Sequence, residues 1–107
     1  MTEINNNEEL MQSIEEDYER INNELSFLFG KEIVDQARQI DIADLNFNDE
    51  MTGTISAGIR QLKKLKHDPN AQKILVTEME PGTCLVLCMW IMDMGLLEKI
   101  QTRSYLI

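Results

Sequence analysis

Residues 45–67, LNFNDEMTGTISAGIRQLKKLKH, contain the pattern that decides the fold. Asn48 is a favoured N-cap residue, and Asp49 and Glu50 place negative charge in the first turn, where the helix dipole favours it. Apolar residues then recur at steps of three or four, which predicts one buried helix face. The members of this face are Met51, Ile55, Ile59, Leu62 and Leu65. Gly58 interrupts the pattern, so we predict two short helices joined by a tight bend there.

The second of these helices concentrates positive charge in an otherwise acidic chain. We call its charged residues the basic segment; they are Arg60, Lys63, Lys64, Lys66 and His67. At helical spacing most of them share one broad face, opposite the apolar residues. Such a face can contact DNA phosphates, which fix position but carry no sequence information. The alternative is a solvated helix face that offsets the acidic half of the chain.

Length and charge restrict the class of protein. The 107 residues suit one domain with a modest core, and aromatic residues are scarce at 6%, so Leu, Ile and Met must supply the packing. Residues 1–50 carry 14 acidic and three basic residues, whereas residues 51–107 carry five acidic and seven basic residues. The first half should therefore repel nucleic acid, and only the second half could approach a phosphate backbone.

Cys84 and Cys88 lie in an apolar run, and no secretory signal precedes them, which predicts reduced thiols in a cytoplasmic protein. A spacing of four would place both thiols on one helix face. A closed zinc site needs four ligands and the chain has a single histidine, so we expect buried cysteines with no metal or cofactor. The longest apolar run, residues 84–92, is shorter than the roughly 20 residues that span a bilayer, so no membrane segment is expected.

Residues 8–28 predict a long helix with an apolar seam over about three heptads. The seam consists of Met11, Ile14, Tyr18, Ile21, Leu25 and Leu28, and the outer face is strongly acidic. Two coverings remain open: this chain's own helices, or a partner helix across a homodimer interface. Gly30 is expected to end the helix in a left-handed conformation, and residues 1–7 are expected to fray.

The following segments are shorter. Residues 31–40 predict a second helix, and residues 40–47 form a connector with apolar anchors at Ile42, Leu45 and Phe47. Residues 93–102 predict the end of a last helix with Leu96, Leu97 and Ile100 facing inward, and the tail RSYLI is apolar enough to pack against a neighbour.

Residues 73–92 leave two structures open. Asp68-Pro69 is a helix start signal, and a helix is favoured because Leu, Met and Cys outnumber β-branched residues after Pro81. The alternative is a short β-hairpin about the turn at Pro81-Gly82. Trp90 is expected in the core or at an interface in either case.

A family resemblance covers residues 23–66. LSFL at residues 25–28 is similar to the Leu-Ser-Tyr-Leu helix of the FlhD family of flagellar transcriptional activators. LNFNDEM at residues 45–51 resembles the family's Leu-Gly-Ile-Asn-Glu-Glu-Met pattern at nearly the same distance. Residues 54–57 and 61–65 stand where the family has Thr-Leu-Ala and Gln-Met-Val-Lys-Leu. The family's Leu-Val-Cys-His-Phe-Arg segment has no clean counterpart, since residues 85–90 lack the His and the Arg.

This resemblance implies a transcriptional activator subunit that works in a hetero-oligomer with an FlhC-like partner, which supplies much of the DNA contact. The sequence contains no phosphate-binding glycine loop, nucleophile elbow or HExxH motif, so we do not expect an enzyme or a small-molecule substrate.

We therefore predict an all-α fold of about five short helices in a single domain, residues 1–107, with a hairpin near residues 73–92 as the alternative there. The predicted function is a non-enzymatic transcriptional regulator subunit that resembles FlhD, forms a homodimer and binds promoter DNA within a larger complex. The alternative is a small acidic interaction protein, such as an anti-regulator, a phage-type inhibitor or a chaperone, which would use its acidic N-terminal helix to occupy a basic surface on a target.

Overall fold

The computed structural model describes the backbone of residues 2–101 and the side chains from Glu8 onward. This part of the chain is all-α, with helices α1 Thr2–Phe29, α2 Lys31–Gln39, α3 Asp49–Lys64, α4 Pro69–Glu78, α5 Pro81–Met94 and α6 Leu97–Ile100. A 3₁₀ turn, η1, covers Ile42–Asp44. The predicted all-α fold class is confirmed, and α1, with 28 residues, contains the long helix predicted over residues 8–28.

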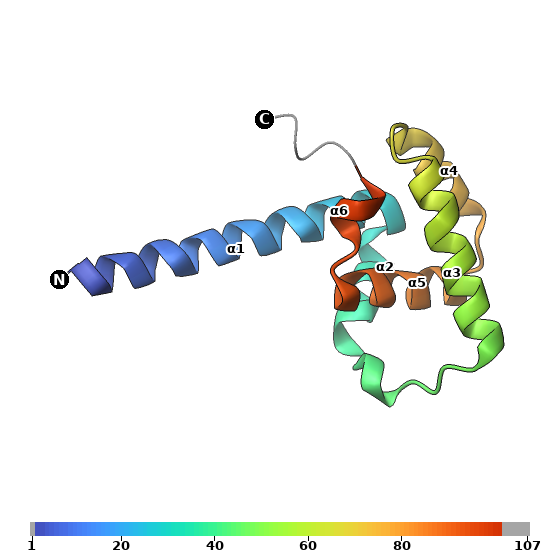
Figure 1. Cartoon of the computed structure of the whole chain (residues 1–107), viewed down its shortest axis with the longest axis horizontal. Coiled ribbons are helices and arrows are strands. Elements are labelled where there is room, and N and C mark those ends of the chain that lie inside the picture. The colour runs from blue at the N-terminus through green and yellow to red at the C-terminus, as the bar shows by residue number, and fades with distance from the viewer. Residues whose placement is uncertain (1, 102–107) are drawn as a thin grey trace.

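Figure 1 shows the arrangement: α1 projects away from the remaining helices, which gather around its C-terminal part. The α5 helix is at the centre of this gathering and packs against α1, α2, α3 and η1. It is apolar on most of its surface, as expected for a helix enclosed by others, and it buries Cys84, Leu87, Cys88, Met89 and Ile91. We call residues 20–101 the body.

Local signals in the sequence place several helix ends where they were predicted. Asn48 Oδ1 accepts a hydrogen bond of 2.8 Å from the Met51 N–H, and Asp68 Oδ1 accepts one of 3.1 Å from the Ala71 N–H. Gly30 ends α1 at the predicted residue, but its φ of +92° and ψ of 147° lie outside the left-handed helical region that was predicted, in a conformation that glycine adopts easily. Residues 2–7 are included in α1, and the expected fraying of residues 1–7 stays a prediction.

The predicted bend at Gly58 is wrong, because α3 runs unbroken from Asp49 to Lys64. Gly58 is buried, and a Cβ built on it would lie 3.1 Å from Leu87 Cδ2 on α5. The absence of a side chain at this position therefore lets α3 and α5 approach closely.

The hairpin alternative for residues 73–92 is also wrong, since this region forms α4 and α5. Pro81 occupies the first turn of α5, where its missing N–H costs nothing. The predicted helix over residues 93–102 is interrupted: Gly95, at φ +63°, ends α5, and only the four residues of α6 follow. Leu97 and Ile100 are buried and Leu96 is half-buried, as expected. The expectation for the tail after Gln101 lies outside the described residues.

Gln72 is a buried polar residue that joins three helices. Its Nε2 donates hydrogen bonds to the Leu62 carbonyl, at 2.8 Å, and to the Ile100 carbonyl, at 2.6 Å. Since the side chain is only 1% exposed, the two carbonyls satisfy its amide away from water. This connection fixes α4 between the ends of α3 and α6.

Candidate interaction surfaces

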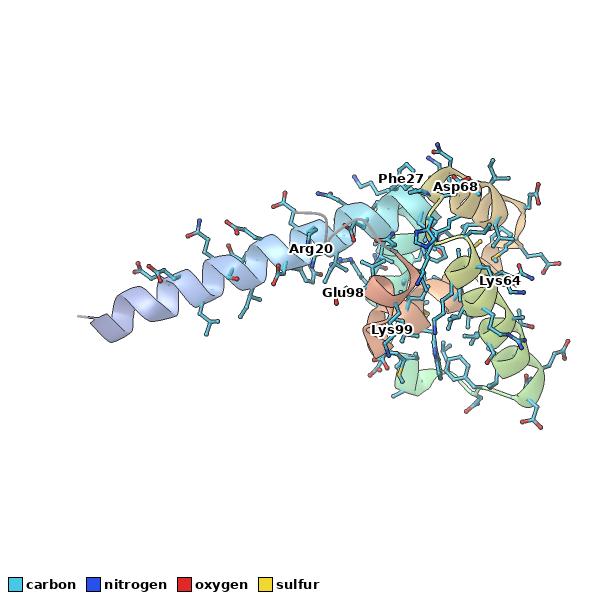
Figure 2. All side chains as sticks on the ribbon, turned by 45° about the horizontal axis from the view of Figure 1, so that its top comes forward. Arg20, Phe27, Lys64, Asp68, Glu98 and Lys99 are labelled. Carbon is cyan, nitrogen blue, oxygen red and sulfur yellow. The ribbon has the colours of Figure 1, made fainter. Side chains whose placement is uncertain are left out.

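The first candidate surface is the part of α1 that extends beyond the body. Every side chain from Glu8 to Glu19 is exposed, and Figure 2 shows them pointing away from the helix with no other element beside them. We call residues 8–19 the arm. At about 1.5 Å per residue it extends roughly 18 Å from the body.

The arm presents four large apolar side chains on one face. The spacing of these side chains places them within about 100° of the helix circumference. They are Leu10, Met11, Ile14 and Tyr18, and each is 59–62% exposed. We call these four residues the apolar stripe. Scattered apolar residues are normal on protein surfaces, whereas a contiguous row of this kind marks an interaction site.

The structure divides the six residues of the predicted dimer interface. Met11, Ile14 and Tyr18 belong to the exposed stripe, and Ile21 is half-buried. Leu25 and Leu28 are 0% and 2% exposed and belong to the core of their own chain. The body therefore covers the C-terminal part of this helix, whereas no described residue outside α1 covers the arm, so a partner helix stays open as the covering there.

Acidic side chains border the stripe on both sides. Helical spacing places Glu8 and Glu15 along one edge and Asp17 along the other, and all three are exposed. Arg20, the single basic residue of α1, lies on the far face, with its Nη1 3.7 Å from Glu24 Oε2. The environment of the stripe is therefore strongly negative.

A groove of about 340 Å³ opens where the arm meets the body. Its walls come from α1, α2, α5 and the segment around η1, and its lining includes Tyr18, Ile40, Met89, Met92, Asp41 and Asp93. Tyr18 belongs to both the stripe and the groove, so the two form one continuous surface.

Arg38 also lines this groove, and its guanidinium carbon lies 4.2 Å from the centre of the Tyr18 ring. This is a cation–π contact, and it fixes Tyr18 at the base of the arm. The Arg38 Nε is enclosed and makes no hydrogen bond within the described residues, so it retains an unused donor beside the groove.

The second candidate surface is the basic segment. Arg60, Lys63 and Lys64 are exposed on the outer face of α3, opposite the buried residues Ile55, Ile59 and Leu62. Lys66 and His67 are exposed too, but α3 ends at Lys64, so they lie in the turn before α4 rather than on the predicted helix face. Figure 2 labels Lys64 near this end of α3 and Asp68 at the start of α4. The cations near the C-terminus of α3 also complement its dipole. They therefore have a structural role whether or not they contact DNA.

The cysteines lie in the core. The Cys84 thiol donates to the Val76 carbonyl at 3.3 Å, and the Cys88 Sγ lies 3.8 Å from Met92 Sδ. Burial raises the pKa of Cys84, and burial raises the pKa of Cys88 to about 12 despite the opposing charge of Arg38. Both thiols therefore stay protonated near neutral pH, which makes them poor nucleophiles. Within residues 2–101, no three His, Cys, Asp or Glu side chains gather as a metal site would require.

Trp90 packs edge-on against Phe47, with ring centroids 5.4 Å apart and an interplanar angle of 76°. The contact attaches the connector after η1 to α5 and holds the half-buried Trp90 against the core, which is one of the two places expected for it. No helix among the described residues is long and apolar enough to cross a membrane.

Comparisons with protein-family models, with curated proteins and with solved structures found no match for this chain. The surfaces therefore have to be interpreted from their own chemistry.

Sequence reasoning missed Leu10 in the stripe and, apart from Tyr18, the residues of the groove, Arg38 among them. Leu10 could have been found, because it lies four residues before Ile14 and so extends the same face. Arg38 could not, since its contact with Tyr18 and its place beside the groove depend on how α2 packs against α1.

Proposed function

We propose that this chain is a non-enzymatic subunit of a transcription-regulating complex, in which the arm binds another helix and the basic segment contacts DNA phosphates. The exposed apolar stripe carries this proposal. Burying one large apolar side chain fully lowers the free energy by about 1.5–3 kcal/mol. The four side chains of the stripe are mostly exposed in the isolated chain, so much of this stabilisation is absent there. A helical partner would recover it.

The basic segment supplies the second part of the proposal. Its cations are exposed at one end of α3, away from the acidic arm on α1, and the resemblance to the FlhD family points to the same part of the chain. With a net charge of −9, the chain alone should bind DNA poorly, so the contact would form only in a complex with a more basic partner, as an FlhC-like subunit would be. The expected homodimer stays a prediction, since a second copy of this chain is one of the helices that the arm could bind.

A co-purification experiment tests the function. The tagged chain would be isolated from its native host with its partners, and the complex would be titrated with promoter DNA fragments at several salt concentrations. Lys64→Glu should weaken DNA binding and lower the salt dependence by about one unit of slope. Lys31→Glu, which reverses an exposed lysine on α2, is the matched control and should leave binding unchanged.

A second candidate function is favoured by the arm itself. Six exposed acidic residues lie between Glu8 and Glu19 with no basic residue among them. An acidic interaction protein that occupies a basic surface on its target would use these charges. In that case, reversing Glu15 and Glu16 would abolish target binding, whereas Lys64→Glu would have no effect.

A further inference from the structure

We propose that the apolar stripe and the groove at its base together receive an amphipathic helix of another protein, whose apolar face is flanked by Lys or Arg. This inference rests on the proposed function, because it names the chemistry of the partner that binds the arm. It excludes a second copy of α1 as the occupant of the stripe.

The charged residues beside the stripe indicate which kind of helix can bind it. In a two-helix seam built on Met11, Ile14, Tyr18 and Ile21, the positions that face the flanks of a partner helix are the ones beside the seam. In the exposed arm those positions hold Leu10, Glu15 and Asp17, none of which is basic.

Two copies of α1 would therefore form no ion pair at these positions in either orientation. Like charges at such flanking positions disfavour pairing, and opposite charges select the partner. A helix with cations at its flanks converts the same contacts into attraction. The acidic side chains beside the stripe thus favour a helix with basic flanks over a second copy of α1.

The groove supports the same kind of partner, because it combines apolar side chains with carboxylates, as the stripe and its border do. Ile40, Met89 and Met92 give it an apolar lining, and methionine side chains adapt easily to the shape of a partner. Asp41 and Asp93 place two further carboxylates at this end of the surface. A helix that lies along the stripe would thus meet apolar surface and carboxylates over most of its contact, with Arg38 as the one cation among the described residues of the groove lining.

Arg38 adds a directional feature. Its guanidinium is stacked on Tyr18 and is the one cation that the described part of the chain contributes to the lining of the groove. The carbonyl groups at a helix C-terminus are unpaired acceptors with partial negative charge. We infer that the C-terminal end of the docked helix lies at the groove, near Arg38.

Two synthetic peptides test the charge requirement. Each would contain three heptads with a leucine seam, and they would differ only at the flanking positions, which are lysine in one and glutamate in the other. Binding to the full-length chain would be followed by fluorescence anisotropy of the labelled peptide. We expect the lysine-flanked peptide to bind at least about tenfold more tightly at low salt, and the difference to shrink as salt is added.

Matched variants locate the effect on the structure. Glu15→Lys combined with Asp17→Lys should reverse the preference, so that the glutamate-flanked peptide binds more tightly. Glu9→Lys combined with Glu16→Lys makes the same change of charge on the opposite face of the arm and should leave the preference in place. Circular dichroism would show that helicity is equal in all of these proteins.

Several results would overturn the inference: equal binding of both peptides, no binding of the lysine-flanked peptide, or reversal by the control pair as well. A dimer of the unmodified chain in sedimentation that Ile14→Gln dissociates would identify a second copy as the occupant. These outcomes leave the proposed function in place provided that Met11→Gln with Ile14→Gln releases the native partner. If that variant keeps its partner, the proposed function itself fails.

Discussion

At the scale of single residues, Gly53 and Gly58 lie five positions apart in α3 but have different surroundings. A Cβ on Gly53 would meet nothing within 4 Å, whereas a Cβ on Gly58 would lie 3.1 Å from the fully buried Leu87 side chain. We expect Gly53→Ala to stabilise the protein by about 0.5–1 kcal/mol, because alanine loses less backbone entropy in a helix.

Gly58→Ala should lose this advantage, because the fully buried Leu87 side chain would have to shift by a few tenths of an ångström within a packed core. We expect it to be about 1–3 kcal/mol less stable than Gly53→Ala, as overpacked cores are. Urea denaturation of the two variants measures the difference. Equal stabilisation by both substitutions would contradict the close approach of α3 and α5 at this position.

The protonated thiol of Cys88 predicts a dependence of stability on pH. Burial raises the pKa of Cys88 from 9.0 to about 12, so between these values the folded chain holds a proton that the unfolded chain releases. Stability should therefore fall as pH rises through this window, by up to about 1.4 kcal/mol per pH unit for this thiol. Chemical denaturation from pH 8 to 11 measures the slope.

Cys88→Ala is the control for this prediction, since it removes the thiol but keeps every other group that titrates in alkali. Its slope should be shallower than that of the unmodified chain. If the two slopes are equal, the fall in stability comes from other groups and Cys88 is not buried as described.

At the scale of helices, the sequence predicted which segments are helical, but only some of the helix ends. The caps at Asn48 and Asp68 are local signals, since each side chain bonds a backbone N–H three residues later, and both were identified correctly. Gly58 was predicted to break a helix and does not, whereas Gly95, inside the helix predicted over residues 93–102, does end one. The difference lies in Leu87, which packs against Gly58 from another helix, and no pattern within α3 could have indicated it.

The two parts of α1 should also differ in dynamics. Residues 24–29 pack into the core, whereas the arm has no tertiary packing and contains few pairs of opposite charge. A helix without tertiary contacts is marginal in water. We expect the amide hydrogens of residues 12–19 to exchange at least about a hundredfold faster than those of residues 25–29.

Hydrogen exchange with residue-level resolution tests this expectation, and the lysine-flanked peptide provides the control, since binding should slow exchange in the arm but not in the body. Strong protection of the arm in the isolated chain would mean that something covers it already, most simply a second copy.

At the scale of the whole molecule, the charge asymmetry read from the sequence becomes a separation in space, with the acidic arm on α1 and the basic segment at the end of α3 (Figure 1). The apolar seam was predictable residue by residue. Its division into a covered and an exposed part was not, because that depends on how far the body extends along α1. The groove was not predictable either, since it combines side chains from α1, α2 and α5.

This division predicts that the arm serves binding and contributes little to the stability of the body. A chain that lacks residues 1–16 loses Leu10, Met11 and Ile14 but keeps Tyr18 and its contact with Arg38. Since the removed side chains that the structure describes are all exposed, we expect the thermal midpoint to change by less than about 4 °C, which corresponds to under 1 kcal/mol in a domain of this size.

Leu25→Ala is the matched contrast for the shortened chain, because it truncates an apolar residue of the same helix that is 0% exposed. This variant should lose about 2–5 kcal/mol of stability and still bind the lysine-flanked peptide wherever it remains folded. The shortened chain should show the opposite combination, with a stable body and no peptide binding. A shortened chain that melts well below the full-length protein would contradict the division, since it would place the arm among the elements that hold the body together.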